Sequence, residues 1–319
     1  MVATFMELVR GSYSLGARHR GVVATIGNFD GVHLGHQAML SRLRERAQAL
    51  GAPLAVITFE PHPLEFLAPD RAPARLTRLR DKCRLLQAHE VDLLLCLRFR
   101  RRLADMEPEA FVEDILVRGL GVRHLLVGDD FRFGRQRRGD FAMLAQMAEI
   151  YGFGIEQMPT LSHADERVSS TRVRETLAAG ELDHAGRLLG RPYAISGRVV
   201  RGEALGRKLG YPTANIAFHG RPPPLRGVFA VRVGLGDGGM RPAAASLGTR
   251  PTVNGVDTLL ESFLLDFSGE LYGRHVEVAF DARLRDEQHF ESLDALKVQM
   301  AEDVARVRSY YAEQDRRTL

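Results

Sequence analysis

The sequence predicts two domains: an N-terminal α/β domain with a doubly wound parallel sheet, residues 1–186, and a C-terminal small antiparallel β-barrel with a terminal helix, residues 187–319. In the first half, short apolar runs alternate with helix-like stretches, which is typical of a parallel sheet covered by helices. In the second half, apolar runs are closely spaced and separated by turns rich in Gly and Pro, which favours an antiparallel barrel. A length of 319 residues is enough for about two such domains.

The elements of the first half follow from the periodicity of its apolar residues. The run 22–26 predicts a buried strand, and the Gly-rich loop after it leads into a helix that ends at Gly51. The apolar stripe of that helix consists of Met39, Leu40, Leu43, Ala47 and Leu50. The predicted elements that follow are a strand at 54–59, a helix at 81–89, a strand at 92–97, a helix at 108–118 and a strand at 124–127.

The second half begins after a short helix in the segment 182–192, whose Gly-Arg-Pro ending indicates a domain boundary. Apolar runs beyond it predict strands at 194–200, 228–233, 258–267 and 276–280. The predicted terminal helix, 292–311, has apolar residues at three-to-four spacing, namely Leu293, Leu296, Met300, Val304 and Val307.

Composition and charge exclude several classes of protein. A hydrophobic content of 45% is too high for a disordered chain, and two Cys are too few for a disulfide framework or a Cys-based zinc site. The sequence shows neither a signal-peptide pattern nor the roughly 18 consecutive apolar residues that span a membrane, so we expect a cytoplasmic protein with no membrane partner. The net charge is +4, and charges nearly balance in both halves, so we expect no nucleic-acid partner.

The segment 27–36, GNFDGVHLGH, carries the strongest chemical pattern. It lies where a predicted strand ends and a helix begins, and the unpaired N–H groups and the helix dipole at such a point favour an anion. His33 and His36 can donate hydrogen bonds to a triphosphate there, and the intervening Gly lets a nucleotide approach the backbone. Two surface histidines near a helix N-terminus are the alternative, which the preceding strand and G-x-F-D-G disfavour.

Two further segments border the same predicted crevice. Phe59, Pro61 and His62 end the second predicted strand, while Asp130 and Phe131 follow the fourth. Aromatic rings at this edge suit stacking on a flat ring, although Phe131 taken singly suits a core equally well.

The segment 168–174, VSSTRVR, begins a predicted helix. Its hydroxyl groups can cap that helix, and Arg172 and Arg174 can reach the β- and γ-phosphates, where charge collects as pyrophosphate leaves. A plain helix cap is the alternative.

Together these segments resemble the H-x-G-H nucleotidyltransferase superfamily, and within it the N-terminal FMN adenylyltransferase module of bacterial FAD synthetases. The resemblance implies a Rossmann-like nucleotidyltransferase domain that joins FMN to the adenylyl group of ATP. It implies catalytic roles for His33, His36 and Arg174. It also implies that the nucleotide- and flavin-binding residues are Gly27, Asn28, Phe29, Asp30, Gly31, Phe59, Pro61, His62, Asp130, Phe131, Ser170, Thr171 and Arg172.

A second pattern occupies 202–216, GEALGRKLGYPTANI. Its glycines permit a loop that wraps phosphate with backbone amides, and Thr213 and Asn215, two residues apart, lie on one side of an extended segment. Neutral oxygen ligands of this kind, completed by nucleotide phosphates, suit Mg²⁺. The sequence contains no G-x-x-x-x-G-K-[ST] phosphate loop. The alternative is a Gly-rich hairpin with a Pro turn.

This pattern resembles the riboflavin kinase module that follows the adenylyltransferase module in the same family. The resemblance implies an ATP loop with Gly202, Arg207, Gly210 and Pro212, a Mg²⁺ site at Thr213 and Asn215, Glu261 as catalytic base, and Arg285 and Glu287 on the flavin side. The chain departs from many relatives at Phe263, where they carry His, and at Ser246, where they often carry Asn. Neither departure affects the carboxylate.

The resulting hypothesis is a bifunctional enzyme that uses ATP and Mg²⁺ to convert riboflavin into FMN and FMN into FAD. One alternative is an H-x-G-H nucleotidyltransferase with another acceptor, such as phosphopantetheine, which would need no kinase barrel. Another is a non-catalytic flavin-binding or nucleic-acid-binding regulator, against which the retained His33, His36, Thr213, Asn215 and Glu261 argue.

Overall fold

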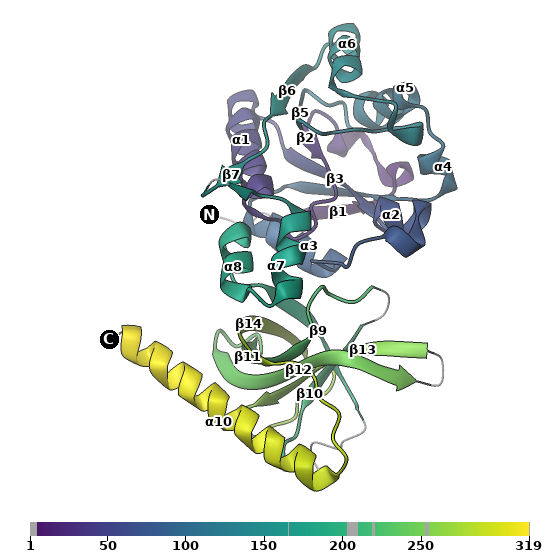
Figure 1. Cartoon of the computed structure of the whole chain (residues 1–319). Coiled ribbons are helices and arrows are strands. Elements are labelled where there is room, and N and C mark those ends of the chain that lie inside the picture. The colour runs from purple at the N-terminus through teal and green to yellow at the C-terminus, as the bar shows by residue number, and fades with distance from the viewer. Residues whose placement is uncertain (1–4, 165, 203–209, 219–220, 253–254, 319) are drawn as a thin grey trace. The chain divides into compact units, whose positions relative to one another are not determined.

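The computed structural model describes the chain except for residues 1–4, 165, 203–209, 219–220, 253–254 and 319, and Figure 1 labels its elements. The chain forms two compact units. The first comprises Met1–Pro73 and Thr77–Ser170, and the second comprises Ala74–Leu76 and Thr171–Leu319. The domain boundary expected between residues 186 and 187 stays a prediction.

The first unit contains a six-stranded parallel sheet in the order β1-β4-β3-β2-β5-β6. Its strands are β1 (Glu7–Arg10), β2 (Val23–Ile26), β3 (Leu54–Glu60), β4 (Leu93–Arg98), β5 (His124–Gly128) and β6 (Gly154–Met158). The chain proceeds from β2 to β3 and β4 on one side and continues with β5 and β6 on the other. The order therefore reverses between β2 and β5, and ligands of such sheets bind beyond the carboxyl ends of the strands at this point.

Both faces of this sheet are buried. Along β3, Leu54 and Val56 pack into one apolar cluster, whereas Ala55 and Ile57 pack into the other. The covering segments are α1 (Leu34–Leu50) and α3 (Leu79–Ala88) on one face, and the π-helical η4 (Val112–Gly119) and α6 (Phe141–Tyr151) on the other. The predicted doubly wound sheet is confirmed, and α1 ends at Gly51 in the left-handed conformation, as the sequence predicts.

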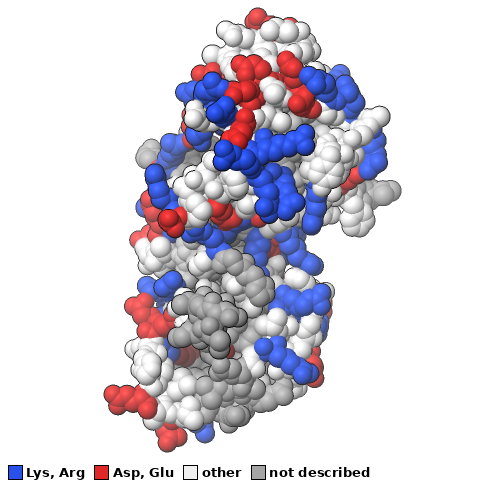
Figure 2. Space-filling model, turned by 90° about the vertical axis from the view of Figure 1, so that its right-hand side faces the viewer, with Lys and Arg blue, Asp and Glu red and all other residues white. Residues whose placement is uncertain are grey.

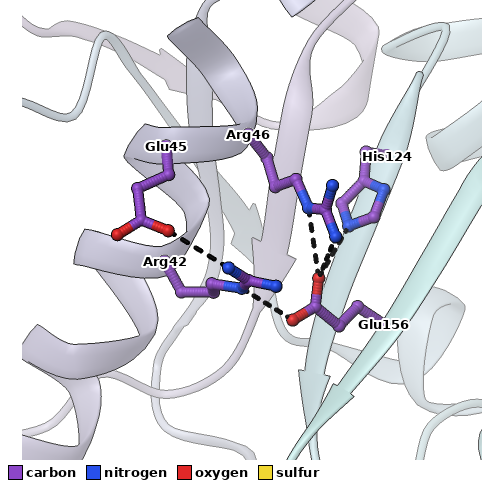
Figure 3. A network of polar contacts seen from close by, with 5 residues as sticks. All are labelled: Arg42, Glu45, Arg46, His124 and Glu156. Atoms are coloured by element: carbon purple, nitrogen blue, oxygen red, sulfur yellow. Dashed lines mark hydrogen bonds and ion pairs between the residues drawn. The ribbon is translucent and has the colours of Figure 1, made fainter. Parts of the chain in front are cut away.

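A polar network ties α1 to the sheet edge (Figure 3). Arg42 Nε donates to Glu156 Oε1 of β6 at 2.8 Å, and Arg46 Nε donates to the other carboxylate oxygen at 3.3 Å. His124 Nε2 of β5 lies 3.6 Å from Glu156 Oε2, and Arg42 also bonds Glu45. Exposed ion pairs of this kind contribute little free energy individually, but together they fix the helix that carries His36.

The second unit contains a closed antiparallel barrel in the order β10-β13-β12-β11-β14-β9, with β9 paired to β10. Its strands are β9 (Ala194–Val200), β10 (Ala214–Phe218), β11 (Gly227–Gly234), β12 (Met240–Thr252), β13 (Gly255–Leu264) and β14 (His275–Arg285). The helices α7 (Ser170–Ala179) and α8 (Leu182–Leu189) precede the barrel in the chain, and α10 (Leu293–Thr318) follows it (Figure 1). The predicted barrel with a terminal helix is confirmed.

The two faces of the barrel strands have different partners. Val231, Leu247 and Leu260 are fully buried inside the barrel. Ala244 and Phe263 lie on the opposite face of the same strands and pack with α10 on the outer surface of the barrel. This alternation follows the two-residue period of a strand, and it places one face of β12 and β13 opposite the terminal helix.

The surface carries charges of both signs. Figure 2 shows a group of basic side chains next to acidic ones on one face of the first unit. Within the described part of the chain, no helix is both long and apolar enough to cross a membrane.

Candidate functional site

The loop between β2 and α1 has an unusual backbone. Phe29, Gly31 and Val32 all have positive φ angles, of 47°, 86° and 43°. A β-branched residue rarely adopts this conformation, which costs about 1–3 kcal/mol and is concentrated at functional sites. The loop lies directly beyond the carboxyl end of β2, at the reversal of strand order, where a ligand is expected.

Side chains from distant segments hold this loop in place. Asp30 is buried, and its Oδ1 accepts hydrogen bonds from the Thr77 N–H at 2.9 Å and the Thr77 hydroxyl at 3.0 Å. The Gly31 N–H donates to Thr77 Oγ1 at 3.1 Å, and the Ser170 hydroxyl donates to the Asp30 carbonyl at 2.8 Å. The structure thus brings Ser170 to the loop, and it uses the Asp30 side chain to brace the loop.

The two histidines lie face to face. Their ring centroids are 3.7 Å apart, and the Phe29 ring stacks on the other side of His36 at 4.6 Å. Gly35 makes this possible, because a Cβ there would meet the His33 ring at 3.2 Å. A similar contact explains Gly27, whose Cβ would lie 3.2 Å from the Phe29 ring.

The environment keeps His36 neutral. Burial lowers the pKa of His36 well below 6.5, and the charges of His33 and Lys82 lower that pKa further. His36 Nδ1 is buried and, within the described residues, has no hydrogen-bond partner. An imidazolium would leave a buried N–H unpaired, so the ring is suited to donate from one nitrogen while it remains uncharged.

The remaining predicted residues of this unit lie at the same sheet edge. Phe59 packs edge-to-face on Phe99 at 5.8 Å, and His62 Nδ1 accepts from the Leu64 N–H at 3.2 Å, capping α2 (Pro63–Leu67) after the cis bond to Pro61. The Asn28 carbonyl accepts from the Thr58 hydroxyl at 3.2 Å.

Asp130 and Phe131 follow β5 at this edge. Asp130 pairs with Arg167 at 2.9 Å, and Phe131 stacks on the core residue Phe133 at 5.7 Å. Both side chains therefore have partners within their own unit.

Thr171, Arg172 and Arg174 belong to the second unit, whereas the histidines belong to the first. Arg172 pairs with Glu175 at 3.3 Å, and Arg174 Nε donates to the Ala74 carbonyl at 2.6 Å. Their phosphate-binding role stays a prediction.

The second unit has a cavity of about 530 Å³ between the outer face of the barrel and α10. The predicted residues Thr213, Glu261, Arg285 and Glu287 all line this cavity. Its apolar wall includes Tyr211 and Phe263, whose rings meet edge-to-face at 5.2 Å. The cavity has the size and the mixture of apolar walls and few polar groups that are typical of small-molecule sites.

Strand register places the candidate base beside the candidate metal ligands. Glu261 of β13 lies opposite Asn215 of β10 on one side and opposite Ser246 of β12 on the other. Asn215 is 4% exposed, and its Oδ1 lies 3.4 Å from the Thr213 hydroxyl. Gly202 lies against the same amide, because a Cβ there would be 2.4 Å from Asn215 Nδ2.

This donor set fits Mg²⁺. Thr213 and Asn215 offer two neutral oxygens on one side of the chain, and Mg²⁺ binds few protein oxygens when phosphates and waters complete its shell. Of the predicted ATP loop, Gly210 and Pro212 are exposed and Gly210 has a φ of 90°, whereas Arg207 lies outside the described residues.

The cavity contains an ion pair between the barrel and α10. Arg285 donates to both carboxylate oxygens of Asp303 on α10, at 2.8 and 2.6 Å, with the two side chains 15% and 7% exposed. The Glu287 carboxylate lies against Gly248, where a Cβ would overlap it. Sequence reasoning missed Asp303 and Gly248, as well as Thr77 and Lys82, because none has a local motif that indicates its distant partner.

Comparisons with known proteins identify the families that the two halves match. Residues 16–172 match the family described as FAD synthetase, and residues 189–311 match the family described as riboflavin kinase. Proteins named bifunctional riboflavin kinase/FMN adenylyltransferase from Escherichia coli K12, Pseudomonas fluorescens and Haemophilus influenzae are 49%, 51% and 45% identical; each alignment covers 96% of this chain and 98–99% of the relative.

A solved structure from Streptococcus pneumoniae, described as a macrolide-efflux protein, is 27% identical and has a TM-score of 0.78 over 95% of this chain and 99% of that chain. With both halves matched in order and relatives aligned almost end to end, the chain belongs to the family of bifunctional riboflavin kinase/FMN adenylyltransferases.

Proposed function

We propose that the two candidate sites divide the two activities of this family: the barrel unit phosphorylates riboflavin, and the α/β unit adenylylates the FMN that results. The observation that carries the proposal is the register that sets Glu261 beside Asn215 at a cavity between the barrel and α10. A base beside neutral oxygen ligands suits phosphoryl transfer to a hydroxyl group.

In the kinase reaction, Glu261 accepts the proton of the riboflavin 5′-hydroxyl as its oxygen bonds to the γ-phosphorus of ATP. The bond from that phosphorus to ADP breaks, and FMN and ADP leave. Thr213 and Asn215 would hold Mg²⁺, which would neutralise phosphate charge. Glu261 is half-buried beside apolar neighbours on β13, and partial removal from water favours proton acceptance by a carboxylate.

In the adenylyl transfer, a phosphate oxygen of FMN bonds to the α-phosphorus of ATP, and the bond to pyrophosphate breaks. The attacking phosphate is already an anion, so no protein nucleophile is required. Neutral His36 and its neighbour His33 donate hydrogen bonds to the α-phosphate oxygens, where charge develops. Ser170, Thr171, Arg172 and Arg174 hold the departing pyrophosphate.

Separate lesions test this division. His36→Ala should abolish FAD formation and leave FMN formation near normal, and Glu261→Gln should slow FMN formation by about 10²–10⁴-fold, the usual contribution of a general base. Chromatography of the flavins after incubation with riboflavin or FMN, ATP and Mg²⁺ measures both steps.

Exposed residues provide matched controls, namely His163→Ala and Glu270→Gln, which should retain both activities. Loss of FMN formation in folded His36→Ala protein would contradict the two-site assignment. Wild-type protein that adenylylates phosphopantetheine and not FMN would favour the alternative acceptor.

A further inference from the structure

Lys82 is a buried cation that is connected to the loop between β2 and α1. Its side chain is 3% exposed on α3, and it is one of three lysines in a chain with 44 basic residues. Removing an ammonium from water is costly unless polar groups receive it. A buried Lys at this place therefore indicates a function for its charge or its hydrogen bonds.

Hydrogen bonds lead from Lys82 to the loop. Lys82 Nζ donates to the Thr58 hydroxyl of β3 at 3.3 Å, and that hydroxyl donates to the Asn28 carbonyl at 3.2 Å. Thr77, five residues before Lys82, binds Asp30 and Gly31 of the same loop. The segment 77–82 thus braces the loop at two points.

The charge of Lys82 also acts on the catalytic imidazole. Beside burial, which is the largest cause, His33 and Lys82 are the groups among the described residues whose charges lower the pKa of His36. His33 is the N-cap of α1 and His36 lies in the first turn of that helix, whereas Lys82 belongs to α3, so its charge comes from a separate element.

We propose that Lys82 is a positioning residue for adenylyl transfer: through Thr58 it fixes the Asn28 turn of the loop. Its ammonium also adds to burial and to the charge of His33, the larger influences, in keeping His36 in the neutral, donating form. Because Lys82 is only 3% exposed, we assign it a positioning role and no contact with the substrate. This inference rests on the proposed function, in which His36 donates to the α-phosphate.

The test compares Lys82→Met, which removes the charge at similar length, with Lys82→Arg, which retains it. In Lys82→Met the pKa of His36 should rise, so the acidic limb of kcat for FAD formation should move to higher pH. At neutral pH kcat should fall by about 100-fold as the loop loses its brace. Lys82→Arg should keep the acidic limb at its wild-type pH.

Two further measurements make the result decisive. The imidazole titration of His36, followed by NMR in the full chain, should shift upward in Lys82→Met, and FMN formation should be unchanged as an internal control of folding. Thr58→Val should lower kcat and leave the acidic limb at its wild-type pH, because it removes the hydrogen bonds to the loop and retains the charge of Lys82. This variant remains informative if Lys82→Met does not fold.

An unchanged His36 titration and an unchanged acidic limb in Lys82→Met would overturn the inference while wild-type FAD formation stands. Thr58→Val with wild-type kcat would overturn the bracing role. Wild-type protein that makes no FAD would refute the proposed function itself.

Discussion

Gly202 has no room for a side chain, and this predicts a lesion confined to the kinase. A Cβ at this position would lie 2.4 Å from Asn215 Nδ2, whereas ordinary contact begins at 3.4 Å. Gly202→Ala must therefore displace the amide by about 1 Å. Asn215 is 4% exposed and contacts the Thr213 hydroxyl, so the displacement disturbs both proposed Mg²⁺ ligands.

The size of the effect follows from that displacement. A misplacement of about 1 Å in a group that orients a reacting phosphate costs about 100-fold in rate. We therefore expect kcat for FMN formation to fall by about 100-fold in Gly202→Ala, with FAD formation from supplied FMN unchanged. The two rates are measured separately by chromatography, starting from riboflavin or from FMN.

Gly239→Ala is the matched control, because a Cβ there would make only ordinary 3.7 Å contacts with Arg241 and Asp237 in the same unit. It should retain both activities. Wild-type FMN formation in Gly202→Ala would refute the placement of Asn215 at the reacting phosphate.

Three other outcomes are expected. Gly35→Ala should slow FAD formation and spare FMN formation, because its Cβ would press on the His33 ring at 3.2 Å; equal loss of both rates would contradict this. Asp303→Leu should destabilise the second unit by about 3–5 kcal/mol in urea unfolding, since it leaves Arg285 unpaired, and the double variant Arg285→Met/Asp303→Leu should recover most of the loss. Because the folded pKa of His36 is lowered from 6.5, the unfolded chain binds a proton that the folded chain does not as pH falls below that value, so stability should decline there. His36→Gln should reduce this decline between about pH 8 and pH 5, and an identical decline would contradict it.

The fold could be predicted where apolar periodicity is strong. The strand at 22–26 and the helix ending at Gly51 have clear patterns, and both are present. The edge strands β1 and β6 were missed, because ELVR and GIEQM are short and lack an apolar run. β12, the longest strand, was also missed, since MRPAAASLGTRPT is rich in small residues and contains two prolines, and its pairing with two neighbours compensates for weak local propensity.

The sites could be predicted where their residues are close in sequence. His33 and His36 are three residues apart, and Thr213 and Asn215 are two residues apart, so spacing alone groups each pair. Lys82 and Asp303 were missed because their partners, Thr58 and Arg285, come from other elements. Local sequence contains no information on which segments become neighbours in space.

The cavity beside α10 lies outside the closed barrel, whereas Val231, Leu247 and Leu260 fill the interior. The inner faces of the strands therefore form the barrel core, and their outer faces line the cavity. Exchanging Leu296 or Met300 on α10 reshapes the pocket without opening a void in the barrel core. Under the proposed function, α10 is therefore the element to vary for acceptance of bulkier riboflavin analogues.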